Sequence, residues 1–469
     1  MRPLADAVSG FIFFAVPVAG AELPLIVLWL ICAGVFFTGY LRLVNIRGFK
    51  HAVDLVRGKH KTPGDPGEIS QFQALTTAVS GTVGIGNIAG VAVAISLGGP
   101  GATLWLIVAG LLGMSTKLAE CTLAVMYRRE RDGQVSGGPM HYLERGLAVR
   151  NWPKAGRALG LFYAAAMVIG CLGIGNMFQS NQATAILIDV TGGANSVFAD
   201  RAWLAGLLLA AAVALVIIGG IRSIANTTAK LVPAMAGLYV LSALTIIALN
   251  AEALPGAIAA IWNGAFSPQG VAGGALGVMI LGFRRAVFSN EAGLGSAAIA
   301  HAAARTKEPV SEGFVALLEP FIDTVVICTL TALVIITTVY DPALAGSSVS
   351  GIELTTRAFA STLSWSPIPL SIAAILFAYS TILAWSYYGL KAFTYLVGEG
   401  RGAELGFKLF FLTFVVLGSS IQLGALVDLS DALVFVVAIP NLLGLYLMAP
   451  LIRRELISYE RRLQRTTRP

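Results

Sequence analysis

The chain has 469 residues, of which 56% are hydrophobic and 12% charged, and its mean hydropathy is +0.78. Soluble proteins carry about a quarter charged residues, so this composition excludes a soluble protein and indicates one that lies in a membrane. The net charge of +7 does not indicate a nucleic-acid partner, because no soluble domain remains to carry a clustered basic face.

Eleven apolar runs are long enough to cross a bilayer as helices, whereas a β-barrel would show alternating hydrophobicity. We therefore predict an all-α polytopic membrane protein. Residues 11–21 are expected to be an interfacial segment rather than a signal peptide, because Asp6 balances Arg2 before them. The runs cover residues 22–42, 71–97, 101–127, 157–188, 202–220, 228–250, 270–304, 311–338, 367–396, 405–424 and 430–452.

The basic residues predict the orientation, since Lys and Arg crowd cytoplasmic loops. With the N-terminus outside, 26 of the 32 Lys and Arg residues lie in cytoplasmic segments. The other six are Arg2, Arg201 and Arg357 on the opposite side and Lys117, Arg284 and Arg285 within runs. This asymmetry predicts eleven spans, an outside N-terminus and a cytoplasmic C-terminus. The short loops favour a bacterial inner membrane.

The residue types that enzymes need are not grouped in this sequence. Four cysteines lie in separate apolar runs and four histidines are scattered. A Gly-x-Ser-x-Gly elbow and a nucleotide-binding loop are both missing from the sequence. We therefore expect no enzyme and no organic cofactor, and no obligatory protein partner is evident.

The second run carries Gly81, Gly84, Gly86 and Gly90 within ten residues. Each glycine costs about 1 kcal/mol in a helix relative to alanine, so this density predicts an unwound segment at mid-membrane. Close packing of helices through small residues is the alternative interpretation.

The seventh run places Asn290 and Glu291 beside Arg284 and Arg285. A charge at the bilayer centre costs about 2.5–3.5 kcal/mol on the insertion scale, so such groups rarely lack a role. Both runs share the spacing Ser-x-x-x-Gly-x-Gly, and by the span count they cross in opposite directions.

Two interrupted spans of opposite direction are typical of an inverted-repeat transporter. The expected organisation is an interfacial segment, an accessory span and a loop (1–70), a first five-helix repeat (71–250), a second inverted repeat (251–452) and a basic cytoplasmic tail (453–469). A cation channel is the less favoured alternative, because channels commonly repeat one filter motif around an oligomer.

The sequence also resembles the alanine/glycine:cation symporters over nearly its whole length. This resemblance implies a LeuT-type five-plus-five fold and sodium-coupled uptake of a small neutral amino acid, alanine or glycine. Proton coupling, or another small amino acid, is the alternative within carriers. The matching runs are QALTTAVSGTVGIGNIAGV (73–91), GGPGA (98–102), GMSTKLAE (113–120), GGPM (137–140), GNMFQSN (175–181), FSNEAGLGS (288–296), FAYSTILAWSYYG (377–389) and IPNL (439–442).

A zwitterionic amino acid needs donors for its carboxylate and acceptors for its ammonium, and a broken helix supplies both. We expect the carboxylate near the N–H groups of the second run and the ammonium near the seventh. Two aromatic residues, Phe288 and Trp385, are expected to form the walls. The expected substrate residues are Thr82, Gly84, Gly86, Asn87, Gln179, Phe288, Ser289, Asn290, Thr381 and Trp385.

The resemblance implies one sodium ion between the ninth run and the unwound part of the second. The expected ligands are the Ser380 and Thr381 hydroxyls, the Phe377 carbonyl and carbonyls near Gly81 and Gly84. The alternative is that both hydroxyls bond carbonyls of their own helix.

Charged residues within the apolar runs are expected to form two ion pairs. Lys117 and Glu120 are spaced to form an ion pair on one helix face. Glu291 is expected to pair with Arg285 as a gate, because a paired carboxylate stays ionised, and a proton site is the alternative for it.

Overall fold

Helices make up most of the protein, as predicted for an all-α chain. The computed structural model describes residues 9–18, 21–59, 64–131, 133–266, 274–341, 351–421 and 423–466. Up to residue 148 the elements are β1 (Ala15–Val18), β2 (Ala21–Pro24), α2 (Leu25–Tyr40), α3 (Val44–Arg47), α4 (Phe49–Val56), α5 (Gln71–Thr82), η1 (Ile85–Asn87), α6 (Ala89–Gly98), α7 (Ala102–Met126), β3 (Arg129–Arg131), β4 (Gln134–Ser136) and α8 (Pro139–Ala148).

The remaining elements are helical. They are α9 (Pro153–Leu172), η2 (Gly173–Met177), α10 (Phe178–Val190), η3 (Gly193–Asn195), α11 (Ala202–Ile217), α12 (Gly220–Leu249), η4 (Ala251–Ala253), α13 (Leu254–Phe266), α14 (Gly274–Asn290), α15 (Ser296–His301), α16 (Pro309–Ala316), α17 (Leu318–Pro320), η5 (Phe321–Cys328), α18 (Thr329–Thr338), α19 (Gly351–Thr362), α20 (Pro367–Val397), α21 (Arg401–Ser420) and α22 (Leu423–Thr466).

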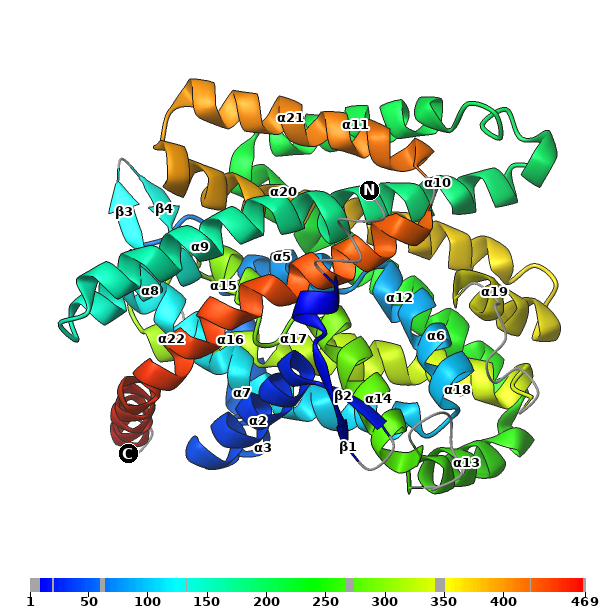
Figure 1. The fold of residues 1–469 in the computed structure, drawn as a ribbon, viewed down its shortest axis with the longest axis horizontal. Helices are drawn as coiled ribbons and strands as arrows, with labels where there is room; N and C mark the ends of the chain where they lie inside the picture. The colour runs from blue at the N-terminus through cyan, green and yellow to red at the C-terminus, as the bar shows by residue number, and fades with distance from the viewer. Residues whose placement is uncertain are drawn as a thin grey trace.

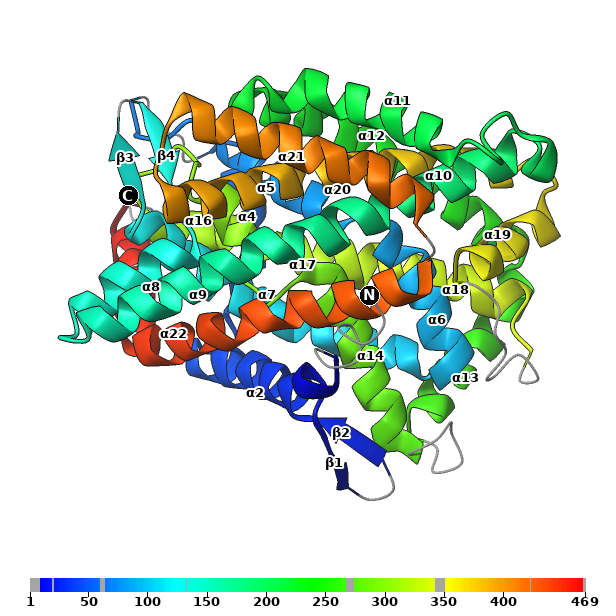
Figure 2. The same ribbon diagram turned by 45° about the horizontal axis from the view of Figure 1, so that its top comes forward.

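The long helices run between two ends of the molecule. One end carries β3, β4 and the C-terminal end of α22, and the other carries α13 and α19 (Figure 1). Helices α11 and α21 lie side by side along one edge in both ribbon views, whereas α5 lies in the interior against α12 and α20 (Figure 2).

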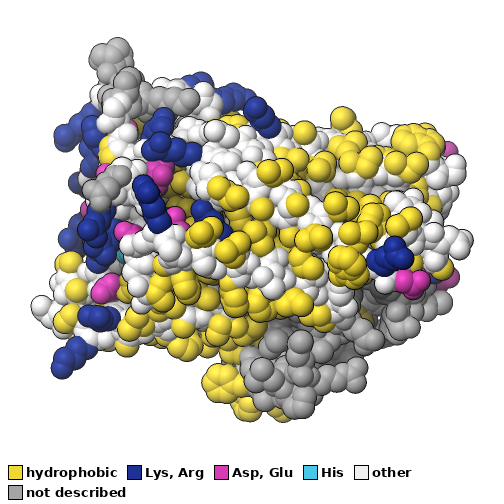
Figure 3. All heavy atoms as spheres, turned by 90° about the horizontal axis from the view of Figure 1, so that it is seen from above, with side chains coloured by type: hydrophobic (Ala, Val, Ile, Leu, Met, Phe, Trp, Pro, Cys, Tyr) yellow, Lys and Arg dark blue, Asp and Glu magenta, His cyan; other side chains and the backbone are white. Residues whose placement is uncertain are grey.

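Hydrophobic and basic side chains are segregated on the surface. Figure 3 shows Lys and Arg side chains gathered at the end that carries β3, β4 and the C-terminal end of α22, while hydrophobic side chains cover the middle of this face. Exposed leucines on the outer helices, such as Leu215 and Leu241, fit contact with lipid chains rather than with water. The basic end and the apolar belt are what a membrane-spanning helical bundle requires.

Seven helical stretches of the described residues are long and apolar enough to cross a bilayer. The number becomes eight if α5 and the helical residues Ile85–Gly98, which meet at an angle of 61°, count as one bent span. The apolar helices α2 and α11 are shorter. The predicted run 157–188 corresponds to one continuous helical stretch, in which the π-helix η2 separates α9 from α10.

Several predicted boundaries were wrong. Helix α12 begins at Gly220, eight residues before the run predicted at 228–250, so the expected gap between this run and the run at 202–220 is helical. Helix α22 continues through the expected tail to Thr466, because its end packs on α4: the Tyr459 hydroxyl lies 2.8 Å from His51 Nε2 and Glu460 pairs with Arg47 at 2.8 Å. The hairpins β1–β2 and β3–β4 and the short helices α13 and α19 were not expected, since such short elements carry little periodicity.

Candidate functional site

The first interruption lies between α5 and α6. Helix α5 starts with a capping box, in which Ser70 and Gln73 bond each other's backbone N–H groups at 3.2 and 2.9 Å. It ends at Thr82, after which the chain turns by 61°. The side chain of Asn87 closes the turn, because its Oδ1 accepts a hydrogen bond of 2.8 Å from the Gly84 N–H.

The second interruption lies between α14 and α15. Helix α14 ends at Asn290, and the Asn290 Oδ1 then accepts a 3.0 Å hydrogen bond from the Ala292 N–H. Glu291 has φ 56°, a conformation that costs a residue with a side chain about 1–2 kcal/mol. The positive φ values of Gly293 and Gly295 complete the turn. The glycines of the predicted motif therefore serve this change of direction.

Asp323 of η5 joins the two interruptions. Its Oδ1 accepts a 2.6 Å hydrogen bond from the Asn87 amide, and its Oδ2 accepts 2.8 Å from Ser289 and 2.6 Å from Thr324. All four side chains are buried. The Asn290 amide donates to Thr324 at 2.9 Å and extends the network. Asp323 was not among the expected site residues, although carboxylates are rare in apolar runs and the run 311–338 contains three of them, Glu312, Glu319 and Asp323.

Helix α20 meets the first interruption from the other side. The Thr381 hydroxyl lies 2.9 Å from the Phe377 carbonyl of its own helix and 3.0 Å from the Ser80 carbonyl of α5. The Ser380 hydroxyl donates to the Phe377 carbonyl at 3.0 Å. Both hydroxyls therefore bond a carbonyl of their own helix, which is the alternative interpretation, and Thr381 also contacts α5. A sodium-binding role for the two hydroxyls stays a prediction.

Gly84 and Gly81, whose carbonyls are two of the expected sodium ligands, have different contacts with α20. A Cβ atom built at Gly84 would lie 2.8 Å from Thr381 Oγ1, so the unwound backbone and α20 are in close approach. The Gly81 carbonyl instead accepts a 3.2 Å hydrogen bond from the Trp385 indole.

Gln179 faces the same glycine from α10. Its side-chain oxygen would lie 3.4 Å from a Cβ atom at Gly84. Its amide donates to the Ile174 carbonyl at 3.1 Å, and Oε1 has no hydrogen-bond partner among the described residues although Gln179 is only 3% exposed. A buried acceptor without a donor is costly, so this atom marks a position where a ligand donor would be favourable.

The remaining expected substrate residues lie around this centre. The Phe288 ring would be 3.4 Å from a Cβ atom at Gly86, and the Trp385 side chain occupies the space beside Gly175. The Thr82 hydroxyl is directed to its own helix, 3.4 Å from the Ala78 carbonyl and 3.3 Å from that of Val79.

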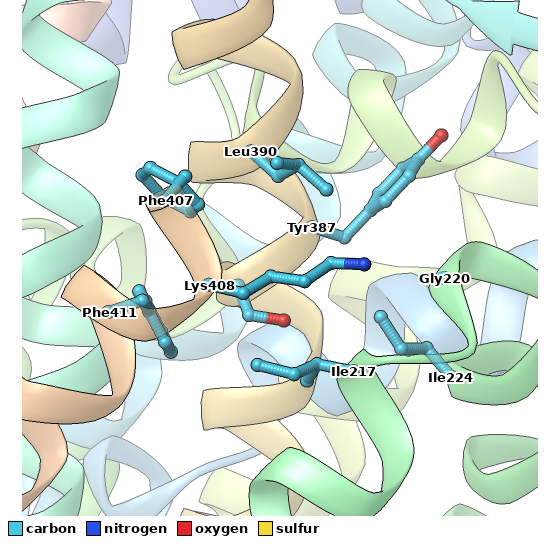
Figure 4. A pocket seen from close by; sticks show the side chains of 9 residues that line it. Ile217, Gly220, Ile224, Tyr387, Leu390, Phe407, Lys408 and Phe411 are labelled. Carbon is cyan, nitrogen blue, oxygen red and sulfur yellow. The ribbon is translucent and has the colours of Figure 1, made fainter. Parts of the chain in front are cut away.

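A small cavity between α11, α12, α20 and α21 is a different feature (Figure 4). Its lining includes Ile217, Phe407 and Phe411, and its volume is about 10 Å³. This volume holds at most about one water molecule. We therefore interpret it as a packing gap and not as a substrate site.

The expected pairing of Lys117 with Glu120 was wrong. Lys117 pairs with Glu319 of α17 at 3.0 Å, and both side chains are fully buried. The Glu120 carboxylate accepts hydrogen bonds from the Gly295 N–H at 3.1 Å and from Asn441 at 2.7 Å. Glu120 therefore stabilises the second interruption through its bond to the Gly295 N–H. Its partners come from distant elements and not from Lys117 on the same helix.

The gate expected from Glu291 and Arg285 is not assembled as an ion pair among the described residues. Glu291 accepts a hydrogen bond from the Ser296 hydroxyl at the start of α15. The neighbouring Arg284 guanidinium lies 4.0 Å above the centre of the Phe13 ring. A gating role for Arg285 and Glu291 stays a prediction.

The model of the sodium:alanine symporter family matches residues 14–469. The chain belongs to this family. The sodium/alanine symporter AgcS of Methanococcus maripaludis is 39% identical over 434 residues, which cover 92% of this chain and 93% of AgcS. Family membership places this symporter among multi-pass membrane proteins that couple amino-acid transport to sodium.

Two further similarities place this symporter among its relatives. The probable sodium/glutamine symporter GlnT of Bacillus subtilis is 32% identical over 439 residues, which cover 93% of this chain and 88% of GlnT. The crystal structure of MhsT in complex with L-phenylalanine matches with a TM-score of 0.58 at 16% identity, over 84% of this chain and 99% of MhsT. The resemblance to the symporter family and the LeuT-type fold are thereby confirmed.

Proposed function

We propose that the protein carries one small neutral amino acid, alanine or glycine, into the cell together with sodium by alternating access. The observation that carries this proposal is the meeting of Gly84, Thr381 and Gln179 at the first interruption. Backbone amides, a hydroxyl, carbonyls and an amide oxygen without a donor converge there, which are the groups that a zwitterion and a sodium ion need.

The substrate carboxylate is proposed to lie against the start of η1. The first N–H groups of a helix lack partners within it, and in the segment from Gly84 to Asn87 the two end residues bond each other. The amides of Ile85 and Gly86 are therefore the ones proposed to meet the carboxylate. The substrate ammonium is then directed to Gln179 Oε1 and to the backbone and side-chain oxygens from Phe288 to Asn290. Phe288 beside Gly86 limits the space for a substrate side chain, which favours alanine or glycine over larger amino acids.

The sodium ion is proposed to lie between α20 and the end of α5. Thr381 Oγ1 and the Phe377 carbonyl are the ligands from α20, with Ser380 beside them. The carbonyls of Gly81 and Gly84 are the proposed ligands from the unwound segment. Carbonyl and hydroxyl oxygens suit this ion, and unwound backbone in a membrane supplies such carbonyls. Sodium is cargo here, not a resident cofactor.

We also propose the eleven-span topology with an outside N-terminus and two inverted repeats at 71–250 and 251–452. Eight apolar spans, the shorter helices α2 and α11, and the interrupted pair α14 and α15 together account for eleven. The basic end of the molecule in Figure 3 is then the cytoplasmic end, and a bacterial inner membrane is the proposed location.

Uptake into proteoliposomes tests the proposal. Labelled alanine and glycine are supplied with an inward sodium gradient, with a matching proton gradient, or with neither. We expect accumulation with sodium alone and weak competition by unlabelled glutamine. Accumulation driven only by protons would overturn the sodium assignment, and glutamine uptake that exceeds alanine uptake would overturn the assigned substrate. Flux that neither saturates nor depends on a gradient would indicate a channel.

A further inference from the structure

A second cavity lies at the basic end of the molecule, away from the two interruptions. Its volume is about 340 Å³, and its walls come from the β3–β4 hairpin, α8, the first half of α9 and the end of α20. The residues that matter in it are Arg129, Arg157, Lys391, Ser136, Glu144 and Glu399.

The two carboxylates of this cavity are already bonded. Glu144 accepts a 2.8 Å hydrogen bond from the Tyr395 hydroxyl, and Glu399 accepts 2.8 Å from the Ser136 hydroxyl. Lys391 also bonds Ser136, at 3.1 Å. These bonds leave both carboxylates charged, but the lining carries Arg129, Arg131, Arg157 and Lys391 against them, so the cavity keeps a net positive charge.

The arginines of the hairpin differ in what they do. Arg128 is nearly buried and donates to four backbone carbonyls at 2.7–3.1 Å, among them those of Pro66 and Thr306, so it fixes the fold. Arg129 and Arg157 are exposed, and their side chains make no hydrogen bond or ion pair with any residue that the structure describes. Two guanidinium groups that line one cavity without a partner suit an anion with several acceptor oxygens.

His141 is a buried residue in the lining of this cavity. It belongs to α8, outside the spans, and burial together with the charges of Arg145, Arg129 and Lys391 lowers its pKa to about 3. The imidazole is therefore neutral at physiological pH and adds no charge of its own. A nearby bound anion would oppose this effect and raise the pKa of His141.

The cavity also has an apolar side. Leu161 and Leu396 line it, and both are exposed, at 40% and 37%. Leu161 belongs to α9 and Leu396 to α20, and both helices are part of stretches long and apolar enough to cross a bilayer. A free phosphate ion would not gain from contact with this apolar surface. A phospholipid, in contrast, can place its phosphate on the basic side chains and its acyl chains on the apolar ones at the same time.

We propose that this cavity binds the headgroup of an anionic phospholipid. The lipid phosphate lies between Arg129, Arg157 and Lys391, and the acyl chains run along Leu161 and Leu396 into the bilayer. The site holds the β3–β4 hairpin against the membrane surface and is separate from the transport site.

Lipid binding to the purified, delipidated full chain in detergent tests this proposal, with native mass spectrometry as the measurement. The probes are phosphatidylglycerol, phosphatidylcholine and, as the free anion, inorganic phosphate. The test variant is Arg129→Gln with Arg157→Gln. The matched control is Arg150→Gln with Lys154→Gln, which removes the same charge from exposed residues at the same end that do not line the cavity.

We expect the wild type and the control variant to bind phosphatidylglycerol equally well. The test variant should bind it at least about tenfold more weakly. Arg129→Lys with Arg157→Lys keeps the charge and should keep most of the binding. Equal binding of phosphatidylcholine, or equal loss in test and control variants, would overturn the proposal. Displacement of the lipid by inorganic phosphate at equal concentration would assign the cavity to a free anion and overturn it too.

Discussion

The two helix interruptions are stabilised by different chemistry. The turn of the first is closed by neutral groups, because the Asn87 amide oxygen accepts from the Gly84 N–H and Thr381 contacts the Ser80 carbonyl. Buried charge reaches this turn through the Asp323 carboxylate, which bonds the Asn87 amide. The second is held through buried charge and scaffold helices, since Glu120 of α7 accepts from the Gly295 N–H and Asn441 of α22 donates to the Gly293 carbonyl.

This difference indicates a division of labour. Hydrogen bonds among neutral groups are worth about 0.5–1.5 kcal/mol each, so a ligand can replace them at small cost. Buried charged contacts are costly to break, so the second interruption suits a fixed pivot. Asp323 bonds both regions, so we expect a ligand bound at one interruption to affect the other through its carboxylate.

The largest effect is expected from the charge that supports the second region. Lys117→Met leaves Glu319 buried without its cation and removes a positive charge that also acts on Glu120 and Glu291. Loss of one partner of a buried ion pair costs about 3–5 kcal/mol, so we expect a large fall in thermal stability in detergent. The double variant Lys117→Met with Glu319→Leu should recover most of this stability. A single variant as stable as the wild type would contradict the role of this pair.

Breaking the connection between the two regions is expected to have the next largest effect. Asp323→Asn turns a carboxylate with three donors into an amide, and hydrogen bonds to charged groups are worth roughly 1.5–3 kcal/mol. Sodium-driven uptake should fall by about tenfold or more. Thr329→Val is the control, because the Thr329 hydroxyl has no hydrogen-bond partner among the described residues. Full uptake by Asp323→Asn would show that transport does not need the connection between the two interruptions, which would contradict this account.

A methyl group tests the neutral region alone. In Gly84→Ala the new Cβ meets Thr381 Oγ1 at 2.8 Å, and overpacking costs about 1–3 kcal/mol. We expect uptake to fall by about tenfold, with a smaller fall in melting temperature than in Lys117→Met. Gly90→Ala is the matched control in the same sequence run, because a Cβ there has no heavy atom within 4 Å. Equal uptake by both variants would place the substrate elsewhere.

The smallest effect is expected at Glu291. The amide in Glu291→Gln can still accept from Ser296, so the turn persists and transport slows only by a few-fold. The dependence of uptake on sodium should not change, which a sodium titration would measure. A change from sodium to proton dependence would instead make Glu291 a proton site.

Local signals in the sequence located the interruptions. Glycine density predicted an unwound segment in the second run, and the chain turns there between Thr82 and Ala89. The glycines after Glu291 mark the second turn in the same way, because positive φ is a local property of the backbone.

Partners across the fold could not be read from spacing. Lys117 and Glu120 are neighbours on α7, yet Lys117 forms its ion pair with Glu319, which is 202 residues away in the sequence. The role of Asp323 could not be predicted from its sequence neighbours either, because its donors Asn87 and Ser289 come from separate elements. The sequence identified polar residues in apolar runs, but only the packing of the helices determines which of them meet.

Sodium activation of alanine uptake in the wild type, Thr381→Ala and Thr381→Ser tests the central claim most directly. The serine variant keeps the hydroxyl between the Phe377 and Ser80 carbonyls, whereas the alanine variant removes it. We predict sodium-dependent uptake in the wild type, a weaker apparent affinity for sodium in Thr381→Ser and no sodium-driven uptake in Thr381→Ala. Unchanged sodium activation in Thr381→Ala would contradict the proposed ion site.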